Sequence, residues 1–222
     1  MPTCCTAYFR CNPRAGASSL VRRITQCPLS HRGGGHSCDW ALYGTARSAR
    51  RWHARFCRNP LTASGDRWGL DHGTWSVLRH VYSHADIPVV QLSIDETQPP
   101  SFHYEVGKRL ALLREEGILI LGSGNVVHNL HAYAWGRHAP EPYDWAISFE
   151  TRVREMLLAG EYKPLVNYEH RLGSEAELAV PTPDHYLPLL YVAGTRISSE
   201  PLTFPVEGVD GGSVSMLAVQ VG

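Results

Sequence analysis

Apolar residues follow the periods of strands and helices only in the second part of the chain, from residue 66 onward. Residues 86–95 (DIPVVQLSID) and 117–122 (GILILG) are short apolar runs rich in branched side chains, which predicts buried strands. Between them, residues 102–116 place apolar side chains at three- and four-residue spacing among charged ones, which predicts an amphipathic helix. This order predicts a parallel strand pair with a right-handed crossover.

The C-terminal half shows the same alternation of apolar runs and amphipathic segments. Residues 143–159 predict a long helix, and residues 213–221 (SVSMLAVQV) alternate like a strand. We therefore predict an α/β fold for residues 66–222: a single domain with a central, largely parallel sheet flanked by helices.

A helix start is predicted within residues 182–190 (TPDHYLPLL). Thr182 can cap the helix, Pro183 suits its first position, and Asp184 complements its positive end. Pro188 is expected to distort or restart the helix, because a proline there removes a backbone donor.

Residues 1–65 differ from the rest of the chain in charge and in cysteine content. They contain ten arginines, no lysine and one acidic residue, whereas residues 66–222 contain eleven basic and twenty acidic residues. All six cysteines lie in residues 1–65, and the apolar residues there follow neither a helical nor a strand period. We expect this segment to lie outside the main domain and to contribute little to a core.

Three interpretations of this segment remain open. Cys27, His31, His36 and Cys38 lie close together and would suit a zinc module, but their spacing matches no common zinc motif. The arginines would suit an arm for nucleic acid or an acidic surface, but interleaved aromatic motifs are missing. We favour the third, a disordered or misassigned segment, because this composition is typical of a GC-rich gene read out of frame.

The composition of the whole chain narrows the class of protein. A hydrophobic content of 43% is typical of a globular protein. No run approaches the roughly 18 apolar residues of a membrane span, and the N-terminus lacks the apolar core of a secretory signal. We expect a cytoplasmic protein with neither a membrane nor a nucleic-acid partner; the sequence indicates no oligomeric state.

The first candidate site residue lies in residues 121–130 (LGSGNVVHNL). Here a predicted strand ends in two glycines, and His128 follows. In α/β folds the strand ends open onto the ligand crevice, and glycines permit close backbone approach. The alternative is a core histidine bonded to a backbone carbonyl.

Two other histidines have a suggestive context. Asp71 precedes His72 and could orient its imidazole and raise its basicity, while Trp68 and Trp75 could wall an aromatic substrate. His185 lies in the first turn of the predicted helix, where the positive helix end would keep an imidazole neutral and available to a metal. A half-buried turn histidine and a solvent-facing one are the alternatives. The remaining histidines of this part are expected to be surface or ordinary polar residues: His80, His84, His103, His131, His138 and His170.

Several motifs together resemble the class III extradiol ring-cleavage dioxygenases, and in particular their 4,5-DOPA dioxygenase group. They are WGLDHGTWSVL, ADIPVVQLSID, GILILGSGNVVHNL, PLVNY, TPDHYLPLLYVAG and PVEGVDGGSVSMLAVQVG. The resemblance extends in order over residues 66–222 and implies a non-haem enzyme that opens a catechol ring with O₂ at an Fe(II) or Zn(II) centre.

The resemblance also implies roles for individual residues. His128 matches a metal-site or acid/base histidine, His185 matches a metal ligand, and His72 matches a histidine that lines the substrate pocket. On this basis the expected catalytic residues are Asp71, His72 and His128, the metal ligands His128 and His185, and the substrate-binding residues His72, Trp75 and Asn125.

One departure from the family pattern affects the expected activity. The family carries HGSP-like and SAHW-like motifs, each of which supplies a metal ligand, and neither occurs in this sequence. With two of four site histidines, the chain is expected to bind Fe(II) poorly and to be inactive or nearly so. The alternative is a metal-poor binding protein built on the dioxygenase fold.

Overall fold

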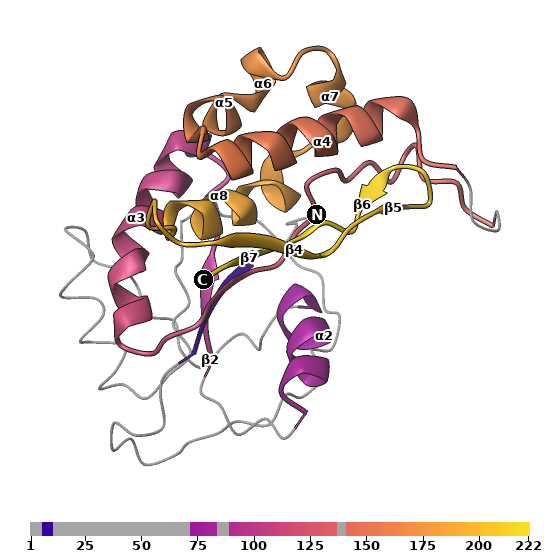
Figure 1. The fold of residues 1–222 in the computed structure, drawn as a ribbon. Coiled ribbons are helices and arrows are strands. Elements are labelled where there is room, and N and C mark those ends of the chain that lie inside the picture. Colours follow the sequence, from indigo (N-terminus) through magenta and orange to yellow (C-terminus); the bar gives the residue numbers. More distant parts are fainter. Residues whose placement is uncertain (1–5, 11–71, 84–88, 137–140) are drawn as a thin grey trace. The chain divides into compact units, whose positions relative to one another are not determined.

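We analysed a computed structural model of the 222-residue chain, which describes residues 6–10, 72–83, 89–136 and 141–222 (Figure 1). The chain divides into two compact units, which we describe separately. The first comprises Met1–Asp95 and Leu112–Ser123, and the second comprises Glu96–Ala111 and Gly124–Gly222.

Within its described residues, the first unit contains the helix α2, the end of α3 (Pro100–Glu115) and a three-stranded sheet. Its elements are β1 (Thr6–Arg10), α2 (His72–Val81), β2 (Val89–Ser93) and β3 (Ile120–Gly122). The strand order is β2-β1-β3, and β1 pairs antiparallel with both neighbours. The buried hydroxyl of Thr74 on α2 donates a hydrogen bond to Gln91 on β2 at 2.9 Å.

The predicted parallel strand pair is wrong. The strands β2 and β3 run in the same direction but do not pair, because β1 lies between them: Ala7 faces Leu92 on one side and Gly122 on the other. Every strand pairing within the described residues is antiparallel, so the central, largely parallel sheet is not seen there. The sequence also predicted no strand in residues 1–65, and β1 corrects this. The residues on which the zinc and arginine-arm hypotheses for that segment depend lie almost entirely outside the described part of the chain.

The predicted helix at residues 102–116 is confirmed as α3 (Pro100–Glu115). Within the second unit, α3 approaches α8 (Leu187–Gly194) at two glycines. A Cβ added at Gly107 would lie 2.3 Å from the Tyr191 carbonyl oxygen, and one added at Gly194 would lie 2.5 Å from that of Tyr104. Only glycine fits so close a backbone approach.

His103 on α3 is fully buried, which corrects its assignment as a surface or ordinary polar residue. Its Nδ1 lies 2.9 Å from the hydroxyl of the equally buried Tyr191 on α8. A histidine can lie inside a core when a partner meets its polar atoms, and here the partner comes from 88 positions further along the chain.

The second unit is built around α4 (Asp144–Ala159), as the sequence predicted. Phe149, Val153 and Leu157 form its buried face. The other elements are α5 (Tyr162–Val166), α6 (Tyr168–Arg171), α7 (Glu175–Ala179), the 3₁₀ turn η1 (Pro183–His185), and strands β4 (Leu202–Val206), β5 (Val209–Asp210), β6 (Val214–Ser215) and β7 (Ala218–Val221). The short helices α5, α6 and α7 follow one another along α4 (Figure 1).

The predicted C-terminal strand is interrupted. Residues 213–221 contain two short strands, β6 paired with β5 and β7 paired with β4. None of the helices in the described part of the chain has the length and apolarity that a membrane crossing requires.

Candidate active site

The loop after β3 carries His128 and lies directly against the segment that carries His185. The backbone N–H of Asn125 donates to the carbonyl of His185 at 3.0 Å. A Cβ added at Gly124 would lie 2.2 Å from that same oxygen, so glycine is required for the approach. Gly124 thus allows the loop to lie against the segment that carries His185.

The same loop is held on its other side by β6. Ser215 donates its N–H to the carbonyl of Val127 at 2.9 Å, and His128 forms an isolated antiparallel bridge with Val214. The Nδ2 of Asn125 donates to the carbonyl of Ser215 at 2.7 Å. Backbone and side-chain bonds thus fix the loop before and after Val127, which is itself fully buried.

These constraints bring two imidazoles together. The rings of His128 and His185 stack with their centroids 3.4 Å apart and an interplanar angle of 18°. Both residues are partly exposed, so the pair can reach a ligand. Two positively charged rings at this distance would repel strongly, and the arrangement therefore suits neutral imidazoles that share one cation or one substrate.

Tyr186 anchors the segment that carries His185. Its side chain is fully buried, its hydroxyl donates to the carbonyl of Leu165 at 3.1 Å, and its ring packs against Tyr168 at 4.4 Å. Burial raises the pKa of the Tyr186 hydroxyl, so this group remains a neutral donor. The residue next to His185 is thereby fixed in the core.

A carboxylate accompanies the two rings. Asp184 is fully buried, and its Oδ2 lies 3.7 Å from Nε2 of His185. Burial lowers the pKa of His128, and the negative charge of Asp184 partly opposes this shift. The net direction keeps His128 uncharged near neutral pH, as a metal ligand or a proton acceptor must be.

The structure does not place His185 at the start of a long helix, where the sequence analysis expected the positive helix end to keep its imidazole neutral. The predicted start at Pro183 is confirmed, but the first turn is the separate 3₁₀ turn η1, and α8 begins at Leu187 with Pro188 in its first turn. Thr182 makes no side-chain capping bond. The environment of His185 is thus set by the neighbouring Asp184 and not by the N-terminus of a long helix.

For the other predicted site residues the structure describes less than it does for His128 and His185. α2 begins at His72, a helix that the sequence did not predict, but the side chains of His72 and Trp75 lie outside the described part of the structure, as does Asp71. Asn125, predicted to bind substrate, lies in the site and uses its amide nitrogen to hold Ser215.

Sequence reasoning missed Glu150, which lies on α4 behind the loop that carries His128. The hydroxyl of Ser215 donates a short hydrogen bond to the Glu150 carboxylate. Burial, followed by the charge of Glu207, raises the pKa of Glu150, while the Ser215 bond and Arg154 oppose the shift. A single Glu in an amphipathic helix gives no sequence signal that it will be partly buried and bonded to a distant serine.

Replacing Glu150 with Gln should stabilise the chain more at pH 7.5 than at pH 4. Because the folded-state pKa is raised, the ionised carboxylate weakens folding above that pKa, and the penalty disappears once both states are protonated. Thermal unfolding at the two pH values measures this, with Glu155→Gln on the same helix as control. An equal shift at both pH values would contradict the prediction.

The donor set fits part of a metal site. Imidazole is a good ligand for both Fe(II) and Zn(II), and a buried carboxylate without a hydrogen-bond donor lies beside the two rings. No group of three metal-binding side chains is present within the described residues. His128 and His185 can therefore supply two donors, and further donors must come from elsewhere.

Comparison with known proteins identifies the family. The model of a family described as the catalytic LigB subunit of aromatic ring-opening dioxygenase matches residues 59–203. The chain belongs to the LigB family. LigB proteins are extradiol aromatic ring-opening dioxygenases, as the sequence motifs predicted.

Two similar proteins carry the same name. The chain is 51% identical over 167 residues to a 4,5-DOPA dioxygenase extradiol from Escherichia coli (strain K12), covering 73% of this chain and 60% of the relative. It is 35% identical over 147 residues to one from Beta vulgaris, covering 66% of this chain and 54% of the relative. The chain thus spans less than two thirds of the length of either.

The fold also matches that of a solved structure. The crystal structure of an uncharacterized protein from Escherichia coli K12 aligns with a TM-score of 0.74 at 45% sequence identity, covering 83% of this chain and 79% of that one. The segments that carry His128 and His185 both fall within the family match, which begins seven residues before the expected boundary at residue 66.

Proposed function

We propose that this chain derives from a cytoplasmic extradiol dioxygenase that cleaves a DOPA-like catechol beside its two hydroxyls with O₂. The observation that carries the proposal is the stacking of His128 and His185, whose rings lie 3.4 Å apart although they come from separate segments. The family membership and the names of the relatives support the reaction class and the catechol.

His128 and His185 would hold the metal, Fe(II) or Zn(II), between their segments. Its contribution, when bound, would be to bring a catecholate and O₂ together and to pass electron density between them. The lowered pKa of His128 leaves a neutral ring that can accept a proton from a catechol hydroxyl and return it later in the reaction. His72, Trp75 and Asn125 are proposed to bind the substrate, and Asp71 and His72 are proposed to act in catalysis.

The rate is proposed to be low. The two motifs that supply further ligands in the family do not occur in this sequence, and the described residues offer two imidazoles without a third metal-binding side chain. A metal held by fewer protein donors binds more weakly, because each donor adds to the affinity.

The test is anaerobic loading of the full chain with Fe(II), followed by addition of L-DOPA and then O₂. We expect slow O₂ uptake with formation of a ring-opened product, and loss of both in a chain that carries His128→Ala and His185→Ala. Catechol binding without metal binding or O₂ uptake would instead favour the alternative, a binding protein on the dioxygenase fold.

A further inference from the structure

The carboxylate of Asp184 is buried, and no hydrogen bond from the described residues stabilises it there. Its exposed fraction is 0%, and neither carboxylate oxygen accepts a hydrogen bond from the described residues. A buried carboxylate without donors is costly. Native proteins retain few such groups unless an ion or an ordered water meets them.

The surroundings of Asp184 point to a cation. Its Oδ2 lies 3.7 Å from Nε2 of His185, and its charge also acts on His128. Within the described part of the chain, no lysine or arginine forms an ion pair with it. A cation held by the two imidazoles would supply the positive charge that no described lysine or arginine gives to Asp184.

A role as a simple helix-end residue does not account for this burial. The turn η1 is only three residues long, and Tyr186 alone separates it from α8. The carboxylate is directed into the protein interior, next to the imidazole that immediately follows it in the sequence.

We propose that Asp184 is a positioning residue that holds His185 and supplies the counter-charge for a divalent cation bound by His128 and His185. This inference rests on the proposed function. It assigns Asp184 a place behind the ligands, since the described residues contain no group of three metal-binding side chains. Carboxylates behind a metal-binding histidine orient the ring, and their loss costs about 10–100-fold in metal affinity or activity.

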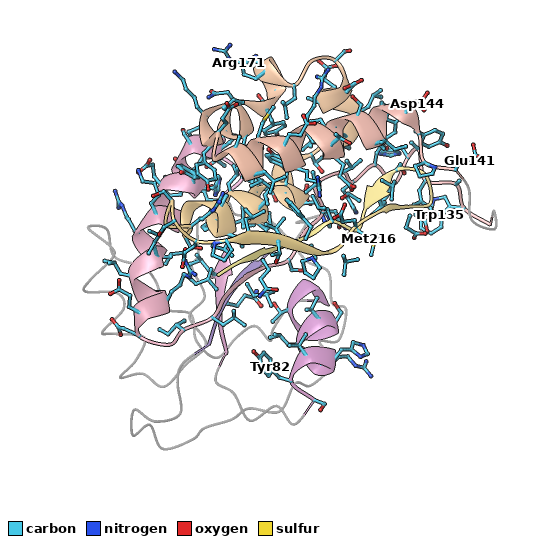
Figure 2. The ribbon with its side chains drawn as sticks, viewed as in Figure 1. Tyr82, Trp135, Glu141, Asp144, Arg171 and Met216 are labelled. Carbon is cyan, nitrogen blue, oxygen red and sulfur yellow. The ribbon has the colours of Figure 1, made fainter. Side chains whose placement is uncertain are left out.

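The test compares the full chain with Asp184→Asn, using Zn(II) as the probe. Asn keeps the size of the side chain but removes the charge. Calorimetry should show Zn(II) affinity lower by about 10–100-fold in the variant, while the thermal midpoint without metal is not lowered, because an uncompensated buried charge has been removed. Asp144→Asn, at the exposed start of α4 (Figure 2), is the matched control and should change neither value.

Three other outcomes would contradict the proposed role of Asp184. Unchanged Zn(II) affinity in Asp184→Asn would overturn this inference and leave the proposed function standing. A strongly lowered midpoint without metal would show that Asp184 has a structural role and would also overturn it. If the unaltered chain binds no Zn(II), both the inference and the proposed metal site fail.

Discussion

Replacing His185 with alanine should remove divalent-metal binding at the site and, with it, any ring cleavage. His185 is one of only two imidazoles that the described residues bring to the site, and its ring stacks on the other at 3.4 Å. Losing one of two donors should lower Zn(II) affinity by at least about 100-fold, more than the loss of a residue behind a ligand. Calorimetry with Zn(II) and O₂ uptake with a catechol measure the two effects.

The control for this experiment is His170→Ala, which removes an exposed histidine of α6 and should leave both measurements unchanged. Zn(II) binding of equal strength in the unaltered chain and in His185→Ala would mean that the metal binds elsewhere. The proposal for the site would then be wrong.

Gly124→Ala should also weaken metal binding, although residue 124 donates no ligand. The new Cβ would lie 2.2 Å from the backbone carbonyl oxygen of His185, and a backbone atom cannot rotate away as a side chain can. The loop must move, the bond from Asn125 to His185 lengthens, and His128 shifts from His185. Overpacking of this kind costs about 1–3 kcal/mol of unfolding free energy.

Gly136→Ala separates this effect from general destabilisation. Gly136 has φ of +72° and open space around it, so alanine there adds backbone strain without a clash. Both variants should unfold at lower temperature, but only Gly124→Ala should lose Zn(II) affinity. Equal Zn(II) affinity in the two variants would show that the close approach of the loop does not build the site.

Much of the second unit could be predicted from sequence because its signals are local. The apolar period of α4 and the placement of Pro183 and Pro188 each depend on a few neighbouring residues. The relation of β2 to β3 could not be predicted in this way. The strand that separates them, β1, comes from near the N-terminus, and pairings over such separations leave little trace in the local pattern.

The sequence motifs could identify the two histidines of the candidate site, but not the charged and polar groups around them. The motifs identified His128 and His185, and the structure brings their rings together. The burial of Asp184 and the bond between Ser215 and Glu150 depend on how distant segments pack, so the sequence assigned Asp184 to a helix end and overlooked Glu150. The same reason hid His103, whose partner Tyr191 lies on a different helix.

The central claim is that His128 and His185, from separate segments, line one metal site. The most direct measurement is a Co(II) titration of the full chain followed by NMR of the histidine ring signals. The account predicts that the signals of both residues broaden together at the same Co(II) concentration, while that of exposed His170 does not. Signals of His128 and His185 that respond at different concentrations, or not at all, would contradict it.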